Sequence, residues 1–118
     1  MKKDYSNQFN KKLIVKEKGR ITQIDICDIL YIECENNICS FVINNDDKTI
    51  SAYKVLKEVE QELSEFNFFR ANRNTLVNIA NVRTYSKVNQ KPTIELINNK
   101  KIIISKNKLS DFFKILRN

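Results

Sequence analysis

The sequence predicts a mostly β protein, with about ten short strands in stacked antiparallel sheets, one amphipathic helix and a short C-terminal helix. Three observations predict this class. Apolar runs rich in β-branched and aromatic residues recur at short intervals, as strands do. The breaks between them are polar, Asn-rich and too short for the crossovers that parallel strands need. Apolar residues recur at helical spacing only in the middle of the chain and at its C-terminus.

The first half of the chain is expected to form a hairpin and then a three-stranded meander. Residues 1–12 are polar and are expected to be a flexible arm, which leaves 13–118 as the folded domain. The single glycine, Gly19, marks the hairpin turn. The meander is antiparallel because its polar breaks, 35–37 and 44–47, are so short. The expected strands of this half are 13–15, 20–24, 29–34, 38–43 and 48–52.

A helix is expected over residues 54–65, with one apolar face packed on a sheet and a solvated polar face. The chain then returns to strands, interrupted by a lysine-bearing loop at 86–92 that ends in the single proline, Pro92. The expected strands here are 75–79, 82–85, 93–97 and 101–104. The helical spacing of Leu109, Phe112, Phe113 and Leu116 predicts the short C-terminal helix.

The 118 residues are enough for one domain. The net charge of +7 is distributed unevenly along them. Residues 1–66 contain 10 Lys or Arg and 12 Asp or Glu, whereas residues 67–118 contain 11 Lys or Arg and only Glu95 and Asp111 as acids. A cationic half of this kind is typical of a protein that binds a polyanion. On charge alone, a solvated lysine-rich surface is the alternative.

Composition excludes several chemistries. The chain has no histidine, so it has no histidine-based general base, catalytic triad or metal site. A single glycine excludes the usual glycine-rich phosphate loop. Glu33 and Glu35 would lie on one face of a strand end, but no partner acid or metal motif accompanies them. We therefore expect no enzyme, no cofactor and no metal.

The cysteines and the N-terminus both point to a reducing compartment. No window is apolar enough to span a bilayer, and residues 1–12 have no apolar stretch of a signal peptide, so we expect a cytoplasmic protein. Cys27, Cys34 and Cys39 are odd in number and irregularly spaced, unlike a disulfide framework. We expect all three to be packing thiols, with a redox switch as the alternative.

The stretch 68–78 opens the cationic half and combines apolar ends with a polar middle. Its ends, Phe68 with Phe69 and Leu76 with Val77, are expected to be core residues. The middle holds two arginines and two asparagines, which are the side chains that pair bidentately with phosphates and base edges. The stretch therefore predicts a nucleic-acid contact and not an active site.

Four blocks of this sequence together resemble the LytTR family of bacterial DNA-binding domains. They are residues 28–33, 55–63, 68–78 and 104–106, in the family's order, and the resemblance covers about 13–116. It implies about ten strands in stacked antiparallel sheets with one helix. It also implies a two-component response regulator output domain whose loops read successive major grooves of double-stranded DNA at direct-repeat promoter sites. Two copies are expected on tandem half-sites, and the DNA is usually bent.

The resemblance also implies the site residues. In the family's Phe-x-Arg-x-His-x-Ser motif, Asn72 stands for the histidine and Asn74 for the serine. The implied base contacts are Arg73, Lys106 and Asn37. The implied phosphate or supporting contacts are Asn36, Arg70, Asn72, Asn74, Ser105, Asn107 and Lys108. Further phosphate-contact candidates from the residues themselves are Lys87, Lys91, Lys100 and Lys101. The family's receiver domain, a further expected partner, is absent from this chain, which is either a standalone regulator or an excised output domain.

Two other functions stay open at this stage. The protein could bind RNA or single-stranded nucleic acid, with Phe68 or Phe69 stacking on bases. It could instead be a protein-interaction module whose cationic half docks an acidic partner. Arg70, Asn72 and Asn74 have local alternatives as well, because Arg70 could brace the loop and the asparagines could simply close turns.

Overall fold

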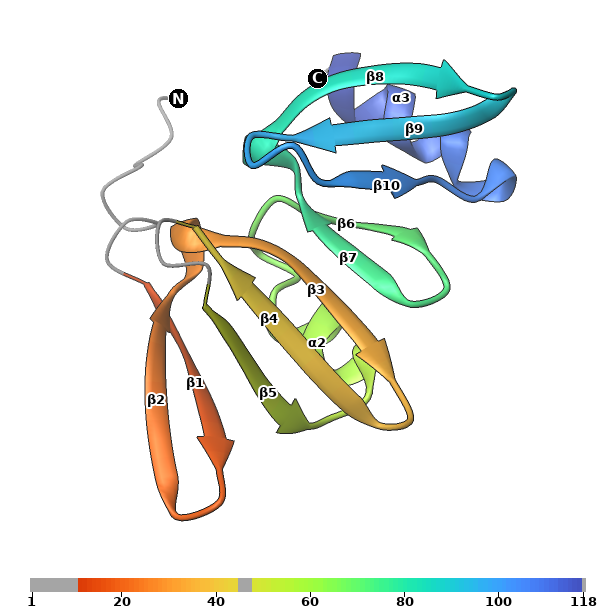
Figure 1. The fold of residues 1–118 in the computed structure, drawn as a ribbon. Helices are drawn as coiled ribbons and strands as arrows, with labels where there is room; N and C mark the ends of the chain where they lie inside the picture. The colour runs from red at the N-terminus through yellow and green to blue at the C-terminus, as the bar shows by residue number, and fades with distance from the viewer. Residues whose placement is uncertain (1–10, 45–47, 118) are drawn as a thin grey trace.

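The computed structural model describes residues 11–44 and 48–117, and within them ten strands form three antiparallel sheets (Figure 1). This confirms the predicted fold class. The expected arm lies largely outside the described residues, which begin just before the first strand. The strands are β1 (Lys12–Glu17), β2 (Arg20–Asp25), β3 (Ile29–Glu35), β4 (Ile38–Ile43), β5 (Thr49–Tyr53), β6 (Phe68–Asn72), β7 (Thr75–Asn78), β8 (Val82–Val88), β9 (Lys91–Leu96) and β10 (Lys101–Ile103).

Residues 11–44 and 48–117 also contain two α-helices and three 3-10 turns. They are α2 (Leu56–Glu62), α3 (Leu109–Arg117), η1 (Ile26–Asp28), η2 (Ile79–Asn81) and η3 (Lys106–Lys108). A five-stranded sheet, in the order β5-β4-β3-β7-β6, lies at the centre. The β1–β2 hairpin lies beside β5, and the β10-β9-β8 sheet lies with α3 at the far end of the molecule (Figure 1).

The pairing of β3 with β7 separates two hydrophobic cores. Side chains alternate between the two faces of a strand, so each strand of this pair serves both cores. Ile32 lies opposite Leu76, and both belong to the core that α2 and the β1–β2 hairpin cover. Tyr31 lies opposite Val77, and both belong to the core that the β10-β9-β8 sheet and α3 cover. Strand residues Leu76 and Val77 are therefore buried although they are adjacent in sequence.

Helix α2 confirms the predicted amphipathic helix and is shorter than expected. Leu56 and Val59 are buried on its inner face, and Leu63 follows directly at its C-terminal cap. The helix begins at Leu56 because Val55 is extended, with φ −97° and ψ 149°. Burial of one face, and not length, stabilises a helix of this size.

The predicted loop over 86–92 is wrong. Strand β8 continues to Val88 and β9 begins at Lys91, so these residues form a hairpin with a two-residue turn. Asn89 and Gln90 form the turn with φ values of 53° and 70°, the left-handed conformation that two-residue hairpin turns need. Pro92 pairs with Lys87 near the start of β9, where a missing N–H is tolerated. The proline therefore lies within a strand and does not end a loop.

The interpretation of all three cysteines as packing thiols is also wrong. Cys34 on β3 and Cys39 on β4 are joined by a disulfide, and of the described cysteines only Cys27 is free. The hairpin register places the two residues directly opposite each other, with their Cα atoms 4.0 Å apart. Their sequence spacing looks irregular because it reflects strand pairing and not a repeated framework.

Two asparagine side chains fasten the junction between the central sheet and the β10-β9-β8 sheet. Asn78 is buried at the end of β7, and its Nδ2 donates to the carbonyl oxygen of Ile29 at 2.9 Å. Its Oδ1 accepts from the backbone N–H of Ala80, so Asn78 is the N-cap of η2. Asn81 Nδ2 donates to the same Ile29 oxygen at 3.2 Å. The turn that leads into β8 is therefore held against the start of β3.

We predict that Asn78→Ala destabilises the fold by about 1–3 kcal/mol, because it removes both hydrogen bonds of a buried side chain, the one to the Ile29 oxygen and the one that caps η2. Chemical denaturation with matched m-values would measure this loss. The matched control is Asn67→Ala at an exposed position, where a change within about 0.5 kcal/mol is expected. Equal stability of the two variants would show that the Asn78 contacts do not hold this junction.

Candidate nucleic-acid interface

Three turns lie along one side of the molecule, at the right of Figure 1. The first joins β3 to β4, the second joins β6 to β7, and the third follows β10 and includes η3. Their tips hold the predicted base-contact residues Asn37, Arg73 and Lys106 respectively. All three of these side chains are exposed. The fold thus brings together residues that are up to 69 positions apart in sequence.

Backbone and side-chain hydrogen bonds join these turns in a row. The N–H of Cys34 donates to the carbonyl oxygen of Asn74 at 2.9 Å, which links the first turn to the second. The N–H of Ser105 donates to the carbonyl oxygen of Ala71 at 2.9 Å, which links the third turn to the second. The relative placement of the turns is therefore fixed by the sheet and not by flexible loops.

The β3–β4 turn is a tight two-residue turn made of Asn36 and Asn37. Their φ values of 53° and 63° are the paired left-handed conformations of a type I′ hairpin turn. Asparagine tolerates this conformation better than other non-glycine residues. The carbonyl oxygen of Asn37 accepts from the N–H of Lys54, and the Cys34–Cys39 disulfide closes the hairpin below the turn. Both asparagine side chains are exposed at the tip.

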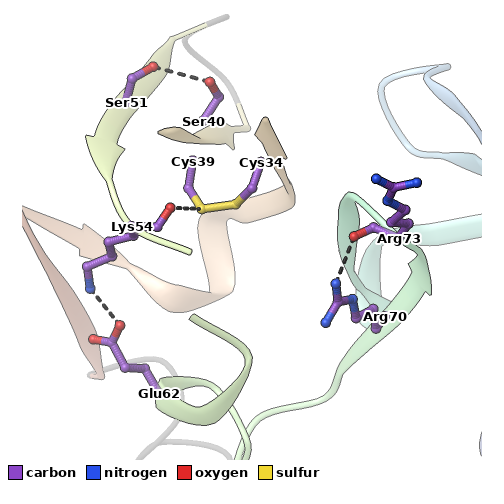
Figure 2. Close-up of a disulfide and its surroundings, with 8 residues drawn as sticks. All are labelled: Cys34, Cys39, Ser40, Ser51, Lys54, Glu62, Arg70 and Arg73. Carbon is purple, nitrogen blue, oxygen red and sulfur yellow. Dashed lines mark hydrogen bonds and ion pairs between the residues drawn. A yellow bond between two sulfur atoms is a disulfide. The ribbon is translucent and has the colours of Figure 1, made fainter. Parts of the chain in front are cut away.

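In the β6–β7 turn the two arginines have different surroundings. The Arg70 guanidinium is directed at the protein, and its Nη2 donates to the carbonyl oxygen of Arg73 at 2.7 Å (Figure 2). Its Nε reaches the carbonyl oxygen of Asn72 at 3.4 Å. The Arg73 side chain points away from Arg70 and is exposed (Figure 2). None of the four ion pairs among the described residues involves Arg73.

Asn72 supports the same turn from the other side. Its Oδ1 accepts from the N–H of Asn74 at 2.9 Å, which closes the turn around Arg73. Its Nδ2 donates to the carbonyl oxygen of Ile103 at 2.8 Å, at the end of β10. One amide therefore fixes the second turn internally and ties it to the third. This geometry needs both a donor and an acceptor on one short side chain.

The third turn runs from Ser105 to Lys108. Lys106 and Asn107 are exposed, whereas Ser105 and Lys108 are half-buried. The N–H of Lys108 donates to the carbonyl oxygen of Ser105 at 2.8 Å, which closes η3 before α3 begins. The aromatic cluster of Phe69 with Phe112 anchors α3 beneath this turn, with ring centroids 5.5 Å apart. Lys106 makes no ion pair among the described residues.

Two open hollows flank Arg73 on this edge. The larger, of about 580 Å³, lies between the first and second turns. The smaller, of about 310 Å³, lies between the second and third turns. Arg70 and Arg73 line both. The remaining lining residues of the smaller hollow are Glu60, Asn72, Ser105, Asn107 and Lys108. Of these, Glu60 is the one that the sequence did not indicate, and only its contact with Arg70 reveals it.

The other lysine candidates lie outside this row. Lys87 and Lys91 are exposed on the β8–β9 hairpin, and Lys101 is exposed on β10. Lys100 Nζ lies over the Tyr31 ring, 5.6 Å from its centroid, in a cation–π contact. None of these four lysines lies at the tip of one of the three turns.

The phenylalanines beside Arg70 belong to the cores. Phe69 is buried in the core beneath α3, and Phe68 is partly buried against the core beneath α2. Stacking on a base requires an accessible ring face, and the packing leaves little of either ring for this purpose. The predicted core role of Phe69, Leu76 and Val77 is confirmed.

Comparisons with known proteins identify the family. The family model described as the LytTr DNA-binding domain matches residues 19–117, so the chain belongs to the LytTR family. This is a family of DNA-binding domains and not of enzymes, and it assigns the chain to DNA-binding transcription regulation. A search of curated proteins found no match.

A solved structure shows the same fold. It is the LytTr DNA-binding domain of a protein from Bacillus cereus described as a methyl-accepting/DNA response regulator. The TM-score is 0.75 at 18% sequence identity, over 89% of this chain and 95% of that one. In the described part of the present chain, no helix is long and apolar enough to cross a membrane.

We predict that the protein, purified without reductant, reacts with one equivalent of a thiol reagent in denaturant and with three after reduction. In the folded state the Cys27 reaction should be slow near neutral pH. Burial, followed by the charge of Asp28, raises the pKa of the Cys27 thiol, and the raised pKa keeps it protonated and unreactive. Three equivalents without reduction would contradict the Cys34–Cys39 disulfide.

Proposed function

We propose that this chain is a sequence-specific, double-stranded DNA-binding domain that reads bases with Arg73, Lys106 and Asn37. The observation that carries the proposal is the row of three hydrogen-bonded turns, each with one of these exposed side chains at its tip. Rigid placement matters because base readout requires donors and acceptors at defined positions along a groove. Family membership supports DNA as the ligand.

Arg73 has the leading part in this proposal. An arginine fork that pairs with O6 and N7 of guanine is the commonest specific contact in the major groove. The Arg73 side chain suits this role because it is exposed, makes no ion pair within the described residues and extends from a turn braced on both sides. Lys106 suits a second guanine, and the Asn37 amide suits the N6 and N7 groups of adenine.

The remaining edge residues bind phosphate or support the turns. Arg70 and Asn72 are supporting residues, since their polar atoms are directed at the protein. Phosphate contacts are assigned to exposed or half-buried polar side chains around the tips, which position the protein without reading sequence. They are Asn36, Asn74, Ser105, Asn107 and Lys108.

The shape supports recognition of successive major grooves. The molecule measures 44 × 40 × 25 Å, so its longer dimensions exceed the repeat of B-DNA, about 34 Å per helical turn. We therefore propose that turns spread along one edge of a molecule of this size enter successive grooves. We further propose that two copies occupy tandem direct-repeat half-sites, and that the chain acts in the cytoplasm as the output domain of a response regulator.

Salt dependence provides the first test. We predict that lysine and arginine side chains, Lys108 among them, neutralise about 5–8 phosphates, so a log–log plot of the association constant against salt should have a slope near −0.9 for each neutralised phosphate. Fluorescence anisotropy of a labelled duplex across a potassium chloride series measures it. An affinity that does not change with salt would contradict the phosphate contacts.

Substitution of Arg73 provides the second test. Arg73→Ala should cost about 1–3 kcal/mol on a duplex selected from a random pool and little on a scrambled duplex. Arg20→Ala is the matched control, because it removes an exposed arginine from the start of β2, outside the proposed edge. An equal loss on both duplexes would make Arg73 a phosphate contact.

The two other candidate functions predict different outcomes. A single-strand binder would prefer single-stranded oligonucleotides in competition with the duplex, but the burial of Phe69 and partial burial of Phe68 disfavour it. A module that docks an acidic protein would fail to retard any nucleic acid at low salt. Competition between duplex and single strands, run alongside the selection from a random pool, separates all three.

A further inference from the structure

Glu60 is a carboxylate on the edge proposed to face DNA, where a negative charge opposes binding. It lies on α2 and lines the hollow between the second and third turns. Its Oε1 is 3.4 Å from Nη1 of Arg70, which makes it the ion-pair partner of that arginine. The other acids of α2 have different surroundings, since Glu62 pairs with Lys54 and Glu58 is exposed without an ion pair among the described residues.

The contact with Glu60 gives the last of the three Arg70 guanidinium nitrogens an acceptor in the protein. All three of its nitrogens then have a protein acceptor, Nη1 on Glu60, Nη2 on the carbonyl oxygen of Arg73, and Nε on the carbonyl oxygen of Asn72. The guanidinium fork is rigid, so fixing one nitrogen restricts the other two. Glu60 therefore orients the group that braces the backbone on which Arg73 is mounted.

We propose that Glu60 is a specificity-determining positioning residue, which holds Arg70 on the base-reading turn and keeps it from binding phosphate. Without the carboxylate, Arg70 is an unpaired cation, about 28% exposed, beside the DNA backbone. Its side chain then swings toward phosphate and gives affinity for any sequence, while the Arg73 turn loses its brace. The Glu60–Arg70 ion pair thus lowers the affinity for DNA of any sequence and raises the discrimination between sequences. This inference rests on the proposed function of the edge.

The test compares Glu60→Gln with Glu58→Gln, which removes the same charge from the same helix without touching Arg70. Affinities are measured for a duplex selected from a random pool and for a scrambled duplex of equal composition, across a potassium chloride series. For Glu60→Gln, scrambled-duplex affinity should rise about three- to tenfold and the log–log salt slope should steepen by about 0.9, one extra phosphate. Affinity for the selected duplex should not rise by the same factor. The specificity ratio, which is the affinity for the selected duplex divided by that for the scrambled duplex, therefore falls.

The control separates positioning from simple loss of charge. Glu58→Gln should change both affinities by the same factor and leave the specificity ratio unchanged, because long-range attraction does not read sequence. If Glu60→Gln also leaves the ratio unchanged, the inference is overturned while the proposed function stands. Melting temperatures of both variants should match the parent, which excludes partial unfolding as the cause.

A measurement without DNA tests the positioning role of Glu60 separately from the proposed DNA-binding function. In ¹H–¹⁵N spectra, Glu60→Gln should shift the Arg70 Nε resonance and the backbone amides of Arg73 and Asn74, whereas Glu58→Gln should not. If these resonances do not move, the positioning contact is absent and the inference fails whatever the DNA data show. If no duplex can be selected, the proposed function fails, and the specificity role of Glu60 fails with it even if the resonances shift.

Discussion

The antiparallel pairing of β3 with β7 is the contact on which the rest of the molecule depends. It joins strands more than 40 residues apart and places Ile32 with Leu76 in one core and Tyr31 with Val77 in the other. A shift of this register by one residue would exchange the two sets of side chains and disrupt both cores together. The same pairing brings the β3–β4 and β6–β7 turns to one end of the central sheet.

The proposed binding edge follows from this arrangement. Short turns between paired strands have little conformational freedom, and here hydrogen bonds from Cys34, Asn72 and Ser105 join one turn to the next. The two arginines of the second turn differ in their contacts. Arg70 is held by protein acceptors, whereas the Arg73 side chain extends into solvent. Two arginines of one motif thus differ in their surroundings, one held by the protein and one exposed, a difference that residue type alone does not specify.

Much of the fold was predictable from the sequence, since strand alternation and helical spacing depend on burial of one face. The predictions failed where the deciding contact is distant or local geometry is unusual. The predicted loop over 86–92 is wrong because the left-handed turn at Asn89 and Gln90 leaves no apolar pattern. The Cys34–Cys39 pair depends on hairpin register, which spacing does not reveal. Family resemblance indicated the edge residues, but Glu60 became visible only through its contact with Arg70.

The most direct test of the central claim is a titration of ¹⁵N-labelled protein with a selected duplex, followed by the backbone amide shifts. A binding edge made of three joined turns predicts that the largest shifts cluster at residues 36–37, 73–74 and 105–108 and saturate together. The β1–β2 hairpin, which lies outside the edge, should hardly respond (Figure 1). Largest shifts on that hairpin, or a response from one turn alone, would contradict the account.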